Sequence, residues 1–268
     1  MFMAKAVEVK SREEIAAMRR AGAVVADILA LLASRITAGV TTGEIDRIAR
    51  EELKLRGAKP AFLNYHGFPG VICVSLNCEV VHGIPSVKRA LKEGDIVGLD
   101  FGAMIDGWFG DAAVTVGVGR ISPEAERLIG VTRESLEKGI AAIQPGARTG
   151  DIGAAIQAHA EAAGYSVVRE FVGHGIGRAL HEDPPVPNYG KAGAGARLKP
   201  GMTIAIEPMV NVGVHEVVTL EDGWTAVTKD RKLSAHFEHT VLVTETGSEV
   251  LTLPSGPFQK IPSTNQIS

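Results

Sequence analysis

Four carboxylates stand at the ends of short apolar runs that have the composition of buried strands. Asp100 and Glu207 close two of these runs, and Asp111 and Glu238 open two others. A single acid at a strand end is usually solvated or paired with a base. Four of them in a sheet core need a partner or a metal ion, because burial removes the hydration of a charged carboxylate. The set therefore predicts a site where several carboxylates face one cavity.

A histidine between two glycines adds a nitrogen donor to this set. His174 lies in the segment Gly173-His174-Gly175, which is expected to be a loop that can approach its neighbours closely. Carboxylates with one imidazole suit manganese, iron, cobalt or zinc better than an ion that prefers thiolates. Acids that can bridge predict two divalent ions about 3.5–4 Å apart, an arrangement that activates water.

An internal repeat places the acids on related elements. Segment 36–45 reappears as segment 143–152, and the same offset of 107 residues relates Asp100 to Glu207. Hydrophobic periodicity, a capping box at Ser11 and stopping glycines predict two helices in each copy. The expected helices are 11–34 and 42–56 in the first copy, and 122–143 and 149–163 in the second. Each half is thus predicted to be two helices followed by a hairpin with two acids.

Turn dipeptides predict how the acids face one another. A hairpin that turns at Asp106-Gly107 puts Asp100 and Asp111 on one face, within about 8 Å of each other. If the second hairpin turns at Asp222-Gly223, Glu207 lies directly opposite Glu238. Both acid pairs are then available to one cavity.

Other residues could serve a substrate. His82 and His181 lie in segments rich in glycine and proline, and each could instead be a structural histidine. Segment 62–73 mixes aromatic residues, glycine, proline and Cys73, which is typical either of a loop packed on the core or of an apolar pocket wall. Sulfur and aromatic surfaces would suit a methionine side chain. Spacing alone leaves both alternatives open.

Composition narrows the class of protein. The chain has 268 residues, 45% of them hydrophobic, and a formal net charge of -3, which favours no nucleic-acid groove and no membrane surface. Cys73 and Cys78 fit neither a disulfide framework nor a zinc finger, so a cytoplasmic protein is expected. No export signal or membrane span is evident. We expect one catalytic domain over 1–256, with halves of about 11–120 and 121–253, and a mobile tail over 257–268.

Six motifs together resemble type I methionine aminopeptidase in its short bacterial form. They lie between Val9 and Leu253: Tyr65-His-Gly-Phe-Pro, Val81-His-Gly-Ile-Pro, Asp100-x10-Asp111, Gly173-His-Gly-Ile-Gly-Arg, Ile206-Glu-Pro-Met and Ser234-Ala-His-Phe-Glu-His-Thr. The resemblance implies an α+β pita-bread fold, in which two pseudo-symmetric halves form a curved antiparallel sheet covered by helices. It also implies removal of the initiator methionine from nascent proteins, by a metal-activated water, when the second residue is small.

The resemblance also implies a role for each residue that matches a motif of the family. Asp100 and Asp111 would bind one ion, Asp111 and Glu238 would bridge, and His174 and Glu207 would complete the second site. The expected catalytic residues are His82, His181 and Glu207, the two histidines contacting the bound peptide and Glu207 moving a proton. The expected pocket residues are Tyr65, Phe68, Cys73 and Trp224, with Phe62, Phe68 and Leu180 where bacterial relatives often have cysteine, tyrosine and phenylalanine. A monovalent cation near Asn77 and Ser234 is a further expectation.

The expected partners are nascent polypeptide N-termini and, near its exit tunnel, the ribosome. A small basic cluster at Lys88, Arg89 and Lys92 is more often a plain solvated surface. We expect a monomer. Two rival functions are an X-Pro peptidase on the same fold, which usually carries a large extra N-terminal domain, and a non-catalytic binding descendant, which would have lost ligands.

Overall fold

The computed structural model describes residues 7–255, so the tail predicted over 257–268 lies outside the described residues. The predicted helices are present, and they are α1 (Arg12–Ser34), α2 (Thr42–Leu55), α3 (Pro123–Ala141) and α4 (Thr149–Ala162). The capping box at the start of α1 is confirmed, because the Ser11 hydroxyl accepts from the Glu14 amide and the Glu14 carboxylate accepts from the Ser11 amide. No helix among the described residues is both long and apolar enough to span a membrane.

The strands form one large sheet and two small ones, and every pairing is antiparallel. The nine-stranded sheet contains β1 (Lys59–Pro60), β2 (Cys73–Leu76), β4 (Ile96–Ile105), β5 (Trp108–Gly117), β7 (Gly173–Gly175), β8 (Glu182–Val186), β9 (Thr203–Ile206), β14 (Glu238–Val243) and β15 (Ser248–Val250). One small sheet contains β6 (Ser166–Val167), β10 (Met209–Asn211) and β13 (Ser234–His236). The other contains β3 (Glu79–Val81), β11 (Val217–Thr219) and β12 (Ala226–Thr228), and a short 3-10 turn, η1, covers Tyr65–Gly67.

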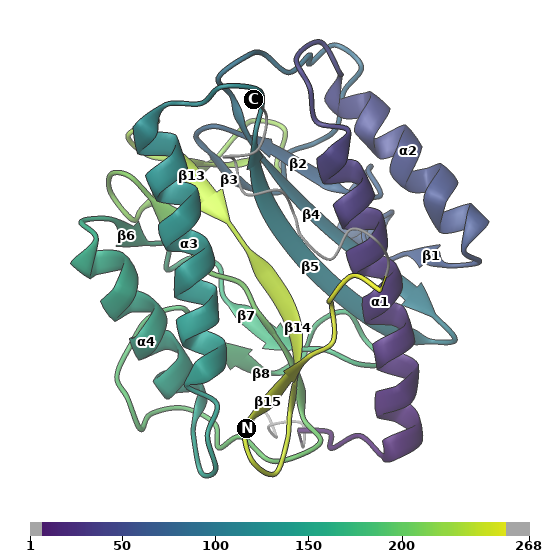
Figure 1. Cartoon of the computed structure of the whole chain (residues 1–268), viewed down its shortest axis with the longest axis vertical. Coiled ribbons are helices and arrows are strands. Elements are labelled where there is room, and N and C mark those ends of the chain that lie inside the picture. The colour runs from purple at the N-terminus through teal and green to yellow at the C-terminus, as the bar shows by residue number, and fades with distance from the viewer. Residues whose placement is uncertain (1–6, 256–268) are drawn as a thin grey trace.

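The two halves lie side by side in Figure 1, with α1 and α2 over one half and α3 and α4 over the other. Helix α1 packs on β4 and β5, while α3 packs on α4 and β13. The order helix, helix, hairpin that the repeat predicts is therefore present in both halves. Strands β5 and β14 join the halves, pairing directly at Ala113 with Glu238 and at Ala112 with His239.

Close contact between α1 and β5 determines which residues face the site. A Cβ atom on Gly110 would lie 3.0 Å from the Gly22 nitrogen, so Gly110 faces α1. Alternation along the strand then turns Asp111 to the opposite face. On the helix side, Phe101 and Ala112 join the main apolar core.

Both predicted turns are confirmed. Ile105 pairs with Trp108 across a two-residue turn in which Asp106 and Gly107 have positive φ. Because Gly102 pairs with Asp111, Asp100 and Asp111 are diagonal neighbours on one face.

The second hairpin keeps one register across all three sheets. The pairs Ile206–His239, Met209–His236 and Val217–Thr228 all centre on the turn at 222–223. The same register places Glu207 opposite Glu238, as predicted. The paired segments between the Glu207–Glu238 pair and the turn, 209–219 and 226–236, form the arm of this hairpin.

Candidate functional site

One cavity of about 350 Å³ gathers nearly all of the predicted site residues. Its walls are formed by Phe62, Tyr65, His66, Phe68, Cys73, His82, Asp100, Asp111, His174, Leu180, His181, Glu207, Trp224 and Glu238. Among the predicted residues, Asn77 and Ser234 do not line it. His66 lines it and was not predicted.

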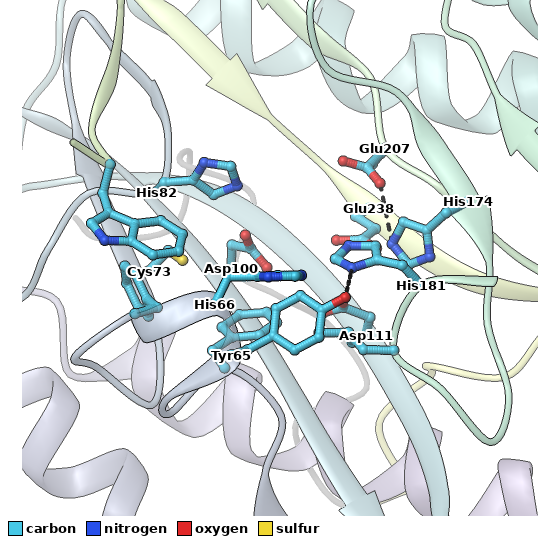
Figure 2. Close-up of a pocket in the computed structure, with 14 residues that line it drawn as sticks. Tyr65, His66, Cys73, His82, Asp100, Asp111, His174, His181, Glu207 and Glu238 are labelled. Atoms are coloured by element: carbon cyan, nitrogen blue, oxygen red, sulfur yellow. Dashed lines mark hydrogen bonds and ion pairs between the residues drawn. The ribbon is translucent and has the colours of Figure 1, made fainter. Parts of the chain in front are cut away.

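The polar wall brings acids from both halves together, as Figure 2 shows. Asp100 and Asp111 come from β4 and β5, Glu207 follows β9, and Glu238 opens β14. Asp111, His174 and Glu238 each offer one ligand atom, and these three atoms lie within 4.8 Å of one another. That spacing can hold a metal ion.

The electrostatics of this wall also favour a cation. Burial raises the pKa of Asp100 to about 7. The pKa values of Asp111, Glu207 and Glu238 lie well above their usual range, mainly through burial and then through repulsion between the acids. Asp111 Oδ1 and Glu238 Oε1 are buried without a hydrogen-bond partner among residues 7–255. Buried acceptors of this kind need a donor or a cation, so the residues present fit a metal ion.

His174 has the orientation of a metal ligand. It lies on strand β7 rather than in the loop that was predicted, and that prediction is wrong because β7 pairs with both β8 and β9. The flanking glycines allow this pairing, since a Cβ atom on either would collide with a carbonyl oxygen of a neighbouring strand. His174 Nδ1 donates to the Gly175 carbonyl at 2.8 Å, which leaves Nε2 as an acceptor 3.5 Å from Glu207 Oε1. Metal-binding histidines commonly have their second nitrogen held in this way.

Besides His174, three histidines line the cavity, His66, His82 and His181. The Tyr65 hydroxyl lies 2.6 Å from His181 Nδ1, and the His181 ring stands 4.1 Å from that of His174. Burial lowers the pKa of His181, as does nearby His66, and burial followed by repulsion from His181 lowers the pKa of His82 to about 4. Neutral imidazoles on this wall can donate or accept one hydrogen bond each.

The opposite wall is apolar. Phe68 contacts Trp224 edge to face at 5.2 Å between ring centroids, and Phe62, Cys73 and Leu180 belong to the same buried cluster. Segment 62–73 is therefore a pocket wall and also part of the core, so both alternatives left open by the sequence are present in this segment.

Known proteins match this chain over nearly its whole length. Residues 16–245 match metallopeptidase family M24. The chain belongs to that family. It is 53% identical over 251 residues to methionine aminopeptidase A of Synechocystis sp., an alignment that covers 94% of this chain and 99% of that one. It is 51% identical over 243 residues to methionine aminopeptidase 1 of Bacillus subtilis, covering 91% and 98% of the two chains.

Solved structures of similar proteins confirm the predicted fold. The crystal structure of methionine aminopeptidase from Thermotoga maritima superposes with a TM-score of 0.90 at 49% identity, covering 92% of this chain and 99% of that one. A prolidase from Pyrococcus furiosus has a TM-score of 0.73 at 24% identity and shares the fold alone, and this chain covers 65% of it. The family prediction and the α+β pita-bread prediction are confirmed, and membership of M24 makes this chain a metal-dependent peptidase.

Asn77 and Ser234 lie next to each other, outside the cavity. The Ser234 amide donates to the Asn77 carbonyl at 2.9 Å, and the buried Ser234 hydroxyl has no hydrogen-bond partner within the described part of the chain. The monovalent cation expected there stays a prediction.

Sequence reasoning missed His66 and the residues that hold the pocket wall. His66 stands beside Tyr65 in a recognised motif, and that place was the available signal. Asp46 accepts from the Val71 amide at 2.7 Å, and Arg50 donates to the Pro69 carbonyl at 3.3 Å, so α2 anchors the segment that carries Phe68. No local pattern marks these two residues, because their partners lie in another segment.

Proposed function

We propose that this protein is a methionine aminopeptidase that removes the N-terminal methionine of nascent proteins and peptides when the second residue is small. The observation that supports this function most is a single cavity that joins a carboxylate–imidazole cluster to an apolar wall of aromatic and sulfur-containing side chains. A hydrolytic centre beside a methionine-sized apolar pocket fits an exopeptidase. The names of the relatives agree with this substrate.

Two divalent ions would be held by the acids and His174. Asp100 and Asp111 would hold one ion, His174 and Glu207 would hold the other, and Asp111 and Glu238 would be shared between the two. Support comes from buried acceptor atoms that have no hydrogen-bond partner within residues 7–255, and from the tautomer of His174. Cobalt, manganese, iron and zinc all suit such ligands. When bound, the ions supply Lewis acidity and lower the pKa of water toward neutrality.

The chain's own side chains would then handle protons and charge. Glu207 accepts a proton at its carboxylate and returns it to the leaving amine. His181 stabilises charge that develops on the carbonyl oxygen or the leaving nitrogen, and His82 assists at the amide nitrogen or the substrate amine. The hydrogen bond between Tyr65 and His181 supports this assignment, because it holds one ring nitrogen and leaves the other for the substrate.

The apolar wall would set the specificity for the first residue. Tyr65, Phe68, Cys73 and Trp224 enclose the methionine side chain, and Phe62 and Leu180 complete the enclosure. A lost methylene contact is worth about 1–3 kcal/mol, so methionine should be preferred over leucine by tens- to hundreds-fold. A monovalent cation at Asn77 and Ser234 belongs to the same proposal.

We further propose a single catalytic domain and a monomer that works in the cytoplasm. The free cysteines Cys73 and Cys78 support a reducing compartment. Contact with the ribosome near its exit tunnel belongs to the same proposal, in which Arg89 of the basic cluster is paired with Glu79 of the same chain.

The decisive experiment measures kcat/KM for release of the first residue from Met-Ala-Ser, Met-Lys-Ser and Leu-Ala-Ser with metal-reconstituted protein. Met-Ala-Ser should be cleaved far faster than the other two peptides. Comparable rates on all three would contradict the pocket assignment. Ala-Pro and Met-Pro serve as controls, and preferential cleavage of these would favour the X-Pro peptidase instead.

A further inference from the structure

Strand β14 changes its hydrogen-bonding partner at Thr240. Before this residue, β14 pairs with β5 at Glu238 and His239, and after it β14 pairs with β15. The backbone of Thr240 already follows the second partner. Its carbonyl accepts from the Leu251 amide at 2.9 Å, and its amide donates to the Thr252 hydroxyl at 3.2 Å. Thr240 is therefore the branch point at which β5 separates from β14.

The residue of β5 that faces this branch point is Asp111. It directly precedes Ala112 and Ala113, which pair with β14 through their backbones. Because the backbone of Thr240 is bonded to the C-terminal segment, it cannot serve Asp111. An unpaired buried amide or carbonyl costs about 1–3 kcal/mol, so the backbone of Asp111 needs another partner.

The Thr240 side chain supplies both bonds. Its hydroxyl accepts from the Asp111 amide at 3.0 Å and donates to the Asp111 carbonyl at 2.8 Å. Thr240 is completely buried, and Asp111 is 4% exposed. One hydroxyl thus replaces the backbone pair at the point where the ladder between β5 and β14 ends.

A second threonine closes the other end of the same ladder. The Thr115 hydroxyl accepts from the His236 amide at 2.9 Å and donates to the His236 carbonyl at 2.8 Å. Glu238 therefore lies on a short direct ladder that is bounded on both sides by threonine hydroxyls. Threonine hydroxyls thus hold the backbones of two residues, Asp111 and His236. Asp111, which Thr240 holds, belongs to the acid cluster.

We propose that Thr240 is a positioning residue that sets the direction of the Asp111 carboxylate toward the metal ions. This inference rests on the proposed role of Asp111 as a bridging ligand. The direction of a side chain follows from its backbone, and a ligand must be held within about 0.5 Å of its productive place. Without the hydroxyl, β5 can move away from β14 at the residue that must reach both ions.

Two substitutions separate the hydroxyl from the rest of the side chain. Thr240→Val keeps the volume and removes the hydroxyl, whereas Thr240→Ser keeps the hydroxyl. Thr132→Val is the matched control, because Thr132 is also completely buried and its hydroxyl donates to the Leu128 carbonyl at 2.7 Å inside α3, remote from the acids in the sequence. Thr240→Ala is the second variant without a hydroxyl if the valine variant does not fold.

Calorimetric titration of Mn(II) and Co(II) into the metal-free proteins provides the readout. Loss of a residue that holds a ligand typically weakens metal binding about 10- to 100-fold, and we expect Thr240→Val in this range. Thr240→Ser and Thr132→Val should bind like the wild type. Equal weakening in Thr240→Val and Thr240→Ser, or none in Thr240→Val, would overturn the proposal.

Hydrogen exchange of the metal-free proteins distinguishes this inference from the proposed function. The Asp111 amide should exchange faster in Thr240→Val than in Thr132→Val, whether or not the protein is an aminopeptidase. Unchanged exchange would overturn the positioning role. A wild-type protein that binds metal but releases no methionine would overturn the proposed function while the comparison of Thr240 variants still stands.

Discussion

Lys10 lies in the segment that precedes α1, and its substitution by methionine should lower both the stability of the protein and its activity. Lys10 Nζ lies 2.7 Å from Glu182 Oε2, and the two side chains are 2% and 14% exposed. The other carboxylate oxygen of Glu182 accepts from the Ala179 amide at 3.0 Å. This bond joins the two ends of segment 179–182, which carries Leu180 and His181 into the cavity. The buried ion pair therefore ties the start of the chain to a wall of the pocket.

The structure gives the size of the effect. Removing one partner of a buried ion pair costs about 3–5 kcal/mol, because the other charge is left without compensation. Glu182 keeps its bond to Ala179 and some contact with water, so we expect the lower end, about 3 kcal/mol. For a chain of this size, that free energy lowers Tm by roughly 6–12 °C. Misplacement of a catalytic group by about 1 Å can cost about 100-fold in rate, so kcat should fall by about 10- to 100-fold through His181.

Thermal unfolding and steady-state kinetics on Met-Ala-Ser test both numbers. Arg19→Met is the matched control, because it breaks an equally short but exposed pair, Arg19 Nε to Glu249 Oε1 at 2.6 Å, and should cost less than about 1 kcal/mol. The double variant Lys10→Met with Glu182→Gln removes both charges and should be more stable than Lys10→Met alone. Equal losses of Tm in Lys10→Met and Arg19→Met would contradict a stabilising role of the buried ion pair, as would a double variant that is no more stable than Lys10→Met.

Three further results are expected. Glu238→Gln should abolish turnover and sharply weaken the second ion, since an amide bridges two dications poorly, and two tightly bound ions in equilibrium dialysis would contradict this. Gly102→Ala should weaken metal binding, because its Cβ atom would lie 3.1 Å from Asp111 Oδ1, and unchanged affinity in the same assay would argue against a tightly built wall. In chelator, the Tm of the wild type relative to that of Asp100→Asn should fall as pH rises from about 4 to about 7, because Asp100 is ionised in the unfolded chain above about pH 4 but stays protonated in the folded protein up to its raised pKa of about 7. Buried histidines with a lowered pKa, such as His82, affect both proteins alike and cancel in this difference, so a Tm difference that does not change with pH would contradict the assignment.

The arrangement of the acids could be predicted from the sequence because two simple periodicities determine it. Alternation along a strand chooses the face of each side chain, and a two-residue turn fixes which residues lie opposite. At Asp106-Gly107 these rules place Asp111 diagonal to Asp100, as observed. The repeat then extends the prediction to Glu207 and Glu238.

The supporting contacts could not be predicted in this way. Thr240 and Asp111 are 129 residues apart, and Lys10 and Glu182 are 172 apart. No local pattern links such pairs, which depend on how distant segments pack. The second hairpin also divides among three sheets. Pro208 has no amide hydrogen to continue the ladder after β9, and the Phe237 amide donates to its carbonyl at 3.3 Å.

The arm of the second hairpin bends back over the acids at its own base. Glu207 and Glu238 stand at that base and Trp224 stands just beyond the turn, yet all three line one cavity. A straight arm would carry the turn at residue 222 about 50 Å away from Glu207, so only a bent arm can bring the indole to the acids. Adding one residue to each strand would turn Trp224 to the opposite face, whereas adding two would keep its present face. The length of this arm can therefore change only in steps of two residue pairs if Trp224 is to stay on the side of the cavity.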